Sequence, residues 1–290
     1  MELKTQQIAL VISEETKSGK MLIDMGWVNG IKNKMKNKDT ADRIITELTS
    51  LYNEDQSQRI SLFFKTGKGE YGEGDRFLGV KVPVTRSIVK KYRNQVSLKD
   101  VENLINSPWH EIRLTGFLLL LELYKTRIKI KDLEEARALV NFYLENLDKG
   151  NNWDLVDLVS GYLLGDWLLM HPEEEKILTD LAGRECCLWH QRVAIVSTHA
   201  LIRAGKFDMT LTIAEKFLTH PHDLIHKATG WMLREIGKRG GKKELVGFLE
   251  KYKSKMPRTM LRYAIEKFPE DERKYFMNKE IKSHLCNNPD

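Results

Sequence analysis

Four segments of similar pattern recur along the chain, and this repetition constrains the fold more than any other feature of the sequence. They begin 44, 36 and 36 residues apart. Within each segment apolar residues return every three or four positions, as on one face of a helix. The segments are WHEIRLTGFLLLLELYK from Trp109, WDLVDLVSGYLLGDWLL from Trp153, WHQRVAIVSTHALIRAG from Trp189 and IHKATGWMLREIGKRG from Ile225. A period of this length, with a helix pair in each unit, is typical of HEAT-like solenoids.

We therefore predict an all-α chain, a right-handed α-solenoid of HEAT-like helix-pair repeats with a concave basic groove. An irregular helical bundle is the alternative. Residues 40–290 are expected to form the repeat domain, and residues 1–39 an N-terminal extension that is helical or partly flexible. A solenoid suits a rod-shaped partner, because its stacked helices build a long concave wall.

Capping residues and helix breakers predict where individual helices begin and end. The apolar spacing from Leu155 to Trp167 predicts one continuous helix behind a cap at residues 151–152. Ser107 and Pro108 predict another helix start, with the proline in the first turn. Predicted helix ends are His171-Pro172, Gly205 and Gly240-Gly241.

Residues 63–75, FFKTGKGEYGEGD, hold four glycines and predict a loop. The stretch lacks the strand-then-helix setting and the Lys-Ser/Thr ending of a phosphate-binding loop, so we expect no nucleotide site here. A helix is predicted to follow at residues 84–93.

Charge is sorted along the chain. The 290 residues include 47 Lys and Arg against 41 Asp and Glu, a net charge of +6. Residues 225–268 alone carry twelve Lys and Arg against four acids, a net of +8, whereas residues 120–180 carry seven against thirteen, a net of −6. The basic window predicts a surface for a polyanion, and a solvated lysine-rich helical face is the alternative.

Three cysteines, two of them adjacent at Cys186 and Cys187, exclude a disulfide framework and a four-thiolate zinc site. We expect a reducing, cytoplasmic compartment. The first twenty residues place charges on both sides of a short apolar run, which fits neither a signal peptide nor a membrane span.

The most informative element is the stretch from Asn152 to Asp157. Asp154 lies in the predicted first helical turn, where a carboxylate interacts with exposed N–H groups, and its expected role is structural. Asp157 lies one turn beyond Trp153 and shares its face, among apolar neighbours. An acid in such surroundings is either paired in a buried salt bridge or functional.

Three further side chains are candidates. Arg192 stands in an otherwise apolar helix, and Trp231 and Arg234 lie one turn apart. The alternative for each tryptophan is a place in the core, and for each arginine an ion pair with its own or the adjoining repeat. A cluster of histidines, with one pair at i, i+4, is a candidate metal site. The cluster begins in a turn that contains a proline, which argues against metal binding, and we expect no metal. The cluster is His220, His222, Asp223 and His226.

Taken together, these residues resemble the AlkD-type DNA alkylation repair glycosylases, a family of HEAT-like repeat proteins. The resemblance covers roughly residues 40–268. Its carriers are Phe77-Leu78-Gly79-Val80 with Pro83, WHEIRL at Trp109, NNWDLVD at Asn151, Gly165-Asp166, WHQRVAI at Trp189 and HKATGWMLRE at His226. Residues before Thr40 have no counterpart in the family pattern, and the glycine-rich stretch is longer than in its short members.

The resemblance implies a site. The family's paired tryptophan and aspartate fall on Trp153 and Asp157, its active-site arginine on Arg192 and its second aromatic on Trp231. Arg234 is expected to contact the DNA backbone. Further expected DNA contacts are Trp109, Lys227, Lys238, Arg258 and Arg262.

The resemblance also implies a reaction: hydrolysis of the N-glycosidic bond of cationic N3- or N7-alkylated purines, such as 3-methyladenine and 7-methylguanine, in duplex DNA. We expect a monofunctional, monomeric enzyme without lyase activity or cofactor. A cationic base between Trp153 and Trp231 would gain cation–π energy of about 0.5–2 kcal/mol per ring. Asp157 would stabilise the oxocarbenium-like sugar and place water, and Arg192 would bind the flanking phosphate. The lesion is expected to stay largely stacked.

Two other functions remain open at this point. A non-catalytic HEAT-repeat nucleic-acid-binding protein would bind DNA in a salt-sensitive way without releasing bases. A protein-interaction scaffold would show no DNA affinity at moderate salt. Fold alone separates none of these functions.

Overall fold

The computed structural model describes residues 39–184 and 187–278. Over this part of the chain the regular structure is helical, with no strand and one isolated β-bridge between Arg76 and Trp109. The predicted all-α class is therefore confirmed. The predicted N-terminal extension lies outside the described residues except for Asp39, and so does Cys186.

The helices follow one another closely along the chain, separated by short turns. The α-helices are α3 (Thr40–Ser50), α4 (Glu54–Phe63), α5 (Val82–Tyr92), α6 (Leu98–Ile105), α7 (His110–Lys129), α8 (Leu133–Glu145), α9 (Trp153–Asp157), α10 (Leu164–Met170), α11 (Lys176–Ala182), α12 (Leu188–Ser197), α13 (His199–Arg203), α14 (Asp208–Lys216), α15 (Asp223–Lys238), α16 (Lys242–Tyr252), α17 (Arg258–Ala264) and α18 (Glu270–Met277). Three short 3₁₀ turns, η1 (Leu147–Lys149), η2 (Pro172–Glu174) and η3 (Phe217–Thr219), connect some of them.

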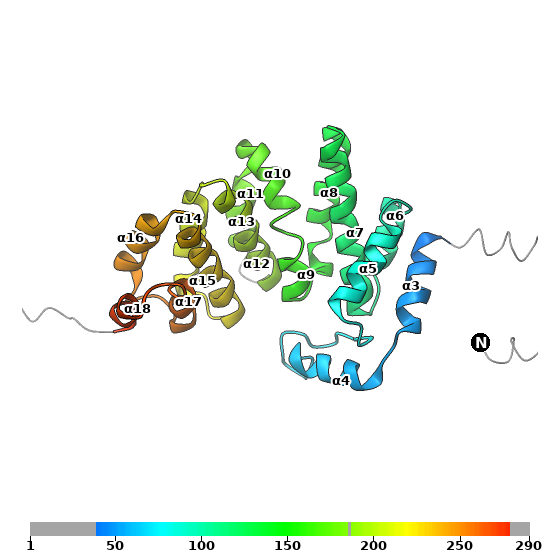
Figure 1. Cartoon of the computed structure of the whole chain (residues 1–290), viewed down its shortest axis with the longest axis horizontal. Coiled ribbons are helices and arrows are strands. Elements are labelled where there is room, and N and C mark those ends of the chain that lie inside the picture. The colour runs from blue at the N-terminus through cyan, green and yellow to red at the C-terminus, as the bar shows by residue number, and fades with distance from the viewer. Residues whose placement is uncertain (1–38, 185–186, 279–290) are drawn as a thin grey trace, which may run out of the picture.

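The helices are laid side by side along the long axis of the molecule (Figure 1). α7 packs between α6 and α8, α12 packs against α11 and α15, and α15 packs against α17. The series α7, α9, α12 and α15 is continuous because each of these helices contacts the next. It carries the residues expected to form the site.

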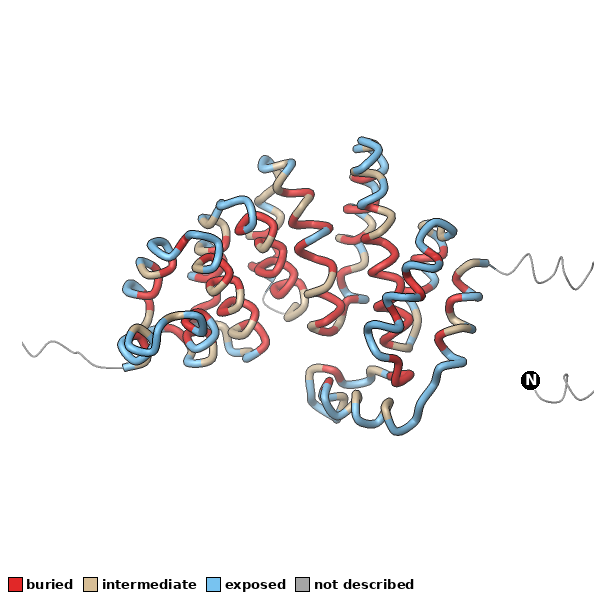
Figure 2. Tube along the Cα trace, viewed as in Figure 1, coloured by how far each residue is buried: buried red, intermediate tan, exposed pale blue. Residues whose placement is uncertain are grey.

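The helix α7 shows why these elements fold as they do. Every residue of α7 from His110 to Leu121 is buried, so this part of the helix must be covered on several sides, whereas its last turns expose Lys125 and Lys129. It is covered by α5, α6 and α8, and Figure 2 shows its central part buried. In contrast, no residue of α4 is buried. This helix lies outside the row of the other helices, near the ends of α5 and α9 (Figures 1 and 2).

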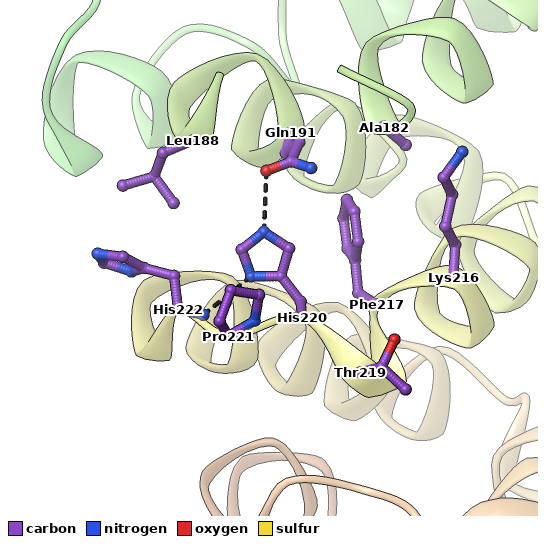
Figure 3. Close-up of a pocket in the computed structure, with 9 residues that line it drawn as sticks. All are labelled: Ala182, Leu188, Gln191, Lys216, Phe217, Thr219, His220, Pro221 and His222. Atoms are coloured by element: carbon purple, nitrogen blue, oxygen red, sulfur yellow. Dashed lines mark hydrogen bonds between the residues drawn. The ribbon is translucent and has the colours of Figure 1, made fainter. Parts of the chain in front are cut away.

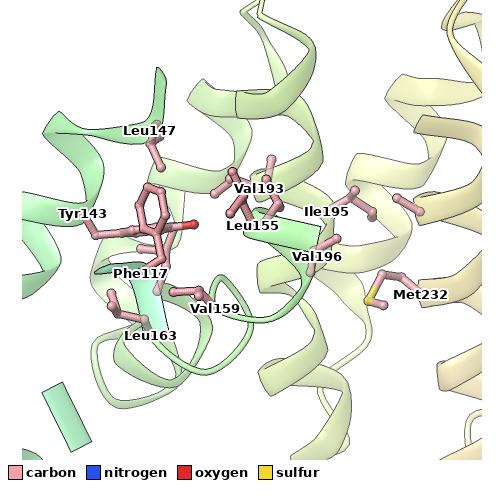
Figure 4. Packing of buried hydrophobic residues seen from close by; sticks show 14 of the residues in the cluster. Phe117, Tyr143, Leu147, Leu155, Val159, Leu163, Val193, Ile195, Val196 and Met232 are labelled. Atoms are coloured by element: carbon pink, nitrogen blue, oxygen red, sulfur yellow. The ribbon is translucent and has the colours of Figure 1, made fainter. Parts of the chain in front are cut away.

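One hydrophobic core joins the site-bearing helices. Phe117 of α7, Leu155 of α9, Val193 of α12 and Met232 of α15 belong to the same buried cluster (Figure 4). Each fully buried side chain of this size contributes about 1.5–3 kcal/mol. The backbone that carries Trp153, Asp157, Arg192 and Trp231 is therefore held by packing, independently of any bound partner.

Two glycines allow the helices to approach closely. A Cβ at Gly165 would lie 2.2 Å from the Ser197 carbonyl oxygen at the end of α12. A Cβ at Gly230 would lie 2.5 Å from both the Met260 carbonyl oxygen and Tyr263 Cβ of α17. Both distances are shorter than any side chain tolerates, so these positions require glycine.

Several predicted boundaries are confirmed and two are wrong. Residues 64–75 form the predicted loop, and helices end at Met170, Arg203 and Lys238, next to their predicted breakers. The predicted continuous helix from Leu155 to Trp167 is instead two short helices, α9 and α10, joined by a turn at residues 158–163, where a Cβ at Gly161 would lie 3.3 Å from the Val196 carbonyl oxygen of α12. The helix predicted to start at Ser107 and Pro108 begins at His110, since Trp109 pairs with Arg76 in the β-bridge.

Candidate active site

The short helix α9 is fixed in orientation by its first residues. Asn152 is its N-cap, and the Asn152 side-chain oxygen accepts a hydrogen bond from the Trp153 N–H at 2.9 Å. Asp154 is buried, and its Oδ1 accepts from the Leu155 N–H at 2.9 Å. The structural role predicted for Asp154 thus matches its contacts. The helix that carries Trp153 and Asp157 therefore begins with two backbone N–H groups bound by side-chain oxygens.

Asp157 and Arg192 form a buried, two-point ion pair. Arg192 Nε donates to Asp157 Oδ1 at 2.8 Å and Nη2 donates to Oδ2 at 2.7 Å. The Asp157 side chain is 15% exposed and that of Arg192 only 6%. Arg192 Nη1 donates to the Leu224 carbonyl oxygen at 2.6 Å. One guanidinium therefore ties α9, α12 and α15 together.

The charge state of Asp157 is set by two opposing effects. Burial raises the pKa of Asp157, whereas the Arg192 guanidinium lowers it by direct charge interaction and by hydrogen bonding. Asp154 adds to the upward shift. The two bonds from Arg192 require acceptors on both oxygens, which is the ionised form of the carboxyl group.

Aromatic side chains surround Trp153. Phe64 stacks on its ring at 5.0 Å with an interplanar angle of 7°, and Phe63 meets its edge at 6.0 Å. One face of Trp153 is thus covered by Phe64. A planar ligand that stacks on this tryptophan must use the opposite face.

Tyr71 is a site residue that the sequence reasoning missed. It comes from residues 64–75, which we call the glycine-rich loop, and its ring meets Trp189 edge-on at 6.1 Å. Burial raises the pKa of Tyr71, while Trp153, Lys227 and Arg192 act to lower it, so these three groups lie near its hydroxyl. The available signal was that Tyr71 is the single aromatic residue between Lys65 and Asp75.

The glycine-rich loop is fastened to α7 and α9 by Asp75. Arg113 Nη2 donates to Asp75 Oδ1, and Asn152 Nδ2 donates to Oδ2 at 3.2 Å. His110 Nδ1 lies 3.1 Å from the same Oδ2. Together these partners lower the pKa of Asp75 although burial raises it.

A second carboxylate orders the chain after the loop. Glu111 accepts hydrogen bonds from the N–H groups of Leu78, Gly79 and Val80 at 2.8, 2.9 and 3.1 Å. Gly79 has a φ of +83°, a conformation that favours glycine. The Phe-Leu-Gly-Val motif is therefore a backbone nest around one buried acid.

The remaining predicted residues lie around this centre, and their contacts differ. Trp231 is half-buried on α15, and its ring is 6.2 Å from that of His199. Arg234 pairs with Glu266, Lys238 with Glu235 at 2.8 Å and Lys227 with Asp223 at 2.7 Å. Arg258 donates to the Met277 carbonyl oxygen, Arg262 is exposed, and Trp109 meets the Tyr52 ring edge-on at 6.4 Å. The structure brings Trp153, Asp157 and Arg192 together with Tyr71, whereas these DNA-contact candidates are spread over α7, α15 and α17.

The histidines weighed as metal ligands make protein hydrogen bonds. His220 Nε2 lies 2.9 Å from Gln191 Oε1, and His220 Nδ1 accepts from the His222 N–H at 3.0 Å (Figure 3). His222 Nδ1 accepts from the Leu224 N–H. These hydrogen bonds shape the turn before α15. Gln191, His220 and His222 are among the residues that line a cavity of about 510 Å³. The residues lining it do not include the four candidate catalytic residues.

A different group among the described residues has ligand atoms close enough for a metal ion. His171, Glu173 and Glu174 place one such atom each within 4.8 Å of one another. Glu174 is bound by both terminal nitrogens of Arg137 and accepts from Trp167 Nε1 at 3.2 Å. The charge of Glu174 is thus balanced by Arg137. The three residues lie at the start of η2 and within it, apart from the candidate active site.

Among the described helices, none combines the length and the hydropathy that crossing a membrane requires.

Comparisons with known proteins concern the family and the fold. A family model described as DNA alkylation repair enzyme matches residues 44–268. A solved structure, a predicted DNA alkylation repair enzyme from Enterococcus faecalis, has a similar fold with a TM-score of 0.59; the chains are 19% identical, and the match covers 76% of this chain and 97% of that chain. No curated protein matches the chain by sequence. Because the family model spans well over half of its residues, the chain belongs to the DNA alkylation repair enzyme family.

Proposed function

We propose that this protein is a monofunctional DNA glycosylase that hydrolyses the N-glycosidic bond of positively charged N3- or N7-alkylated purines in duplex DNA. The observation that carries the proposal is the buried Asp157–Arg192 pair beside Trp153, on two helices, α9 and α12, that share one hydrophobic core. Family membership supports a role in alkylation repair, and these residues supply groups suited to this reaction.

The charged base is bound by aromatic rings. Phe64 covers one face of Trp153, so the cationic base contacts the other face, and Trp231 supplies a second ring. Each contact contributes about 0.5–2 kcal/mol, depending on how far water is excluded. A base that already carries a positive charge is a good leaving group and needs no strong acid to protonate it.

Asp157 supplies the negative charge that the transition state requires. As the glycosidic bond breaks, positive charge develops on the sugar, and a carboxylate held nearby stabilises it. The same carboxylate orients the attacking water and accepts its proton. Arg192 keeps Asp157 in place through two hydrogen bonds, and its contact with the Leu224 carbonyl oxygen uses a third N–H. A guanidinium has five N–H groups, so two remain for the flanking phosphate.

The DNA backbone is held by the basic helices of the C-terminal third, within a HEAT-like solenoid whose concave side faces the duplex. Arg234 is 19% exposed and pairs with Glu266, and the exposed Lys238 pairs with the buried Glu235. Lys227 forms an exposed ion pair with Asp223, of a kind that contributes only about 0–1 kcal/mol. Such pairs are readily exchanged for phosphate contacts. Arg258, Arg262 and Trp109 complete the set. No cofactor is required, and the protein acts as a monomer.

The test is to incubate the protein with methylated duplex DNA and to quantify released 3-methyladenine and 7-methylguanine. Wild type is expected to release both, without cleaving the resulting abasic strand. Asp157→Asn is expected to bind the DNA but to release neither base above the spontaneous rate. Equal release by both proteins would overturn the proposal.

One observation favours a second candidate, a non-catalytic HEAT-repeat nucleic-acid-binding protein. Both oxygens of Asp157 accept from Arg192, as they would in a purely structural ion pair. This candidate predicts binding that weakens steeply with salt, with no base release by wild type. The same experiment, with binding measured alongside, separates the two.

A further inference from the structure

A buried histidine lies between the glycine-rich loop and α9. His110 is 2% exposed at the start of α7. Its Nδ1 is 3.1 Å from Asp75 Oδ2 in the loop, and its Nε2 is 2.8 Å from Asp154 Oδ2 in α9. A neutral imidazole has a single N–H and can donate to one carboxylate, whereas the imidazolium donates to both. The geometry therefore fits the charged ring.

The surroundings of His110 also favour a positive charge. Burial favours the neutral ring, but Asp154 and Asp75 outweigh it and raise the pKa of His110 to about 9. Phe77 stacks on the imidazole at 4.5 Å and Phe64 lies 5.1 Å away, so two π-faces adjoin the cation. A further charged group at this site is Arg113, which also donates a hydrogen bond to Asp75.

Apart from those of Asp75, the hydrogen bonds of the loop are made within it or to α4. Gly67 N–H donates to Glu70 Oε2 at 3.0 Å, Gly69 N–H to Glu73 Oε2 at 2.8 Å and Gly72 N–H to the Lys65 carbonyl oxygen at 3.1 Å. These bonds hold the loop in shape without fixing where it sits. Its position relative to α7 and α9 is set by the contacts of Asp75 together with the stacking of Phe64 on Trp153.

We propose that His110 is a positioning residue: as an imidazolium between Asp75 and Asp154, it fastens the glycine-rich loop to α9 and thereby sets the place of Tyr71 beside Trp153. We call this arrangement the histidine bridge. When the ring loses its proton, one of the two buried carboxylates loses a hydrogen-bond donor. The loop then loosens relative to α9, while the helices of the common core remain packed. The consequence for base release rests on the proposed function.

The direct test is amide hydrogen exchange of residues 64–75 in the full-length protein between pH 7 and pH 10.5, expressed as protection relative to the intrinsic exchange rate at each pH. Wild type is expected to lose at least tenfold protection in the loop as the pH passes about 9. Protection in α12 and α15 is expected to stay within twofold. Loop protection that is independent of pH, or that falls together with α12 and α15, would overturn the proposal.

Three variants sharpen the experiment. Asp154→Asn keeps the shape of the side chain and removes one of the two charges, so loop opening is expected at a lower pH than in wild type. His110→Gln is expected to show a loosened loop already at pH 7, with no further change on raising the pH. His171→Gln alters a partly exposed histidine that pairs with Glu173 away from the loop, and it should behave as wild type. An unchanged midpoint in Asp154→Asn would contradict the histidine bridge.

A second readout links the bridge to catalysis. In the proposed glycosylase, kcat/KM of wild type for release of 3-methyladenine is expected to fall in alkali at the pH where the loop opens. In Asp154→Asn this fall is expected at a lower pH. If the protein releases no base, the exchange experiment still decides whether the bridge exists. Failure of the proposed function and failure of the bridge are thus distinguishable.

Discussion

Arg192 donates one hydrogen bond to each carboxylate oxygen of Asp157, at 2.8 and 2.7 Å, across a gap of 35 positions in the sequence. That separation is close to one repeat of the 36-residue spacing between Trp153 and Trp189. The pair joins α9 to α12, two helices that also contact each other. The ion pair thus both holds the fold together and forms the centre of the candidate site.

Removal of Arg192 should destabilise the fold strongly. Arg192→Ala leaves Asp157 buried without its partner, and breaking a buried pair from one side costs about 3–5 kcal/mol. Urea denaturation followed by circular dichroism measures this loss. Arg203→Ala is the matched control, because the Arg203–Asp166 pair is about one-third exposed and should cost only about 0–1 kcal/mol. Similar losses in both variants would contradict the buried role of Arg192.

The reaction should slow in mild acid. Burial raises the pKa of Asp157 above its ordinary value of 3.8, and the proposed base release uses its ionised carboxylate. Activity is therefore expected to be full at neutral pH and to fall as the pH drops, with a midpoint above 3.8. The measurement is kcat/KM against pH, which reports the free enzyme, after subtraction of spontaneous depurination. A profile that stays flat down to pH 3.8 would show that Asp157 is not the titrating group.

Stability should decline in alkali because of His110. A group with a raised pKa stabilises the fold fully below its unfolded value of 6.5, and this contribution is lost as the pH rises through about 9. The difference corresponds to about 3 kcal/mol. Urea denaturation at intervals from pH 6 to pH 10 should show this decline in wild type. His110→Gln should be less stable at neutral pH, and its stability should change much less over the same interval.

The packing of α15 on α17 can be tested at one atom. Gly230→Ala places a methyl group 2.5 Å from the Met260 carbonyl oxygen, and such overpacking costs about 1–3 kcal/mol. Gly247→Ala is the control, because a Cβ at Gly247 in α16 meets nothing within 4 Å and should stabilise the helix by about 0.5–1 kcal/mol. The two variants are expected to change the free energy of unfolding in opposite directions. A neutral Gly230→Ala would mean that α15 and α17 are less closely packed than described.

Much of the fold was predictable because helix patterning is local. Apolar spacing and capping residues predicted the helical class and several ends, such as those near Gly205 and Gly240. The break after Asp157 was not predictable from apolar spacing, because that spacing continues through residues 158–163, where the chain turns beside α12. The predicted start of α7 at Ser107 and Pro108 is wrong for a similar reason. Trp109 pairs with Arg76 in a β-bridge, and the helix begins only at His110.

The candidate site divides in the same way. Trp153, Asp157 and Arg192 stand at positions that the sequence predicted to be helical, on α9 and α12, which pack against each other. Tyr71 and Phe64 come from an irregular segment without periodicity, so nothing in the sequence indicates where they lie. The contact between Asp75 and Asn152 spans 77 residues. Such contacts follow from the path of the loop, which only the three-dimensional arrangement provides.

The central claim is that Asp157 drives release of alkylated bases, and one measurement tests it most directly. Uniformly methylated duplex DNA is incubated under single-turnover conditions with wild type, Asp157→Asn or Asp148→Asn, the last an exposed aspartate before α9. Wild type and Asp148→Asn are expected to release 3-methyladenine and 7-methylguanine at the same rate, and Asp157→Asn at least 100-fold more slowly while it remains folded and bound to DNA. Release by folded Asp157→Asn at the wild-type rate would contradict the account.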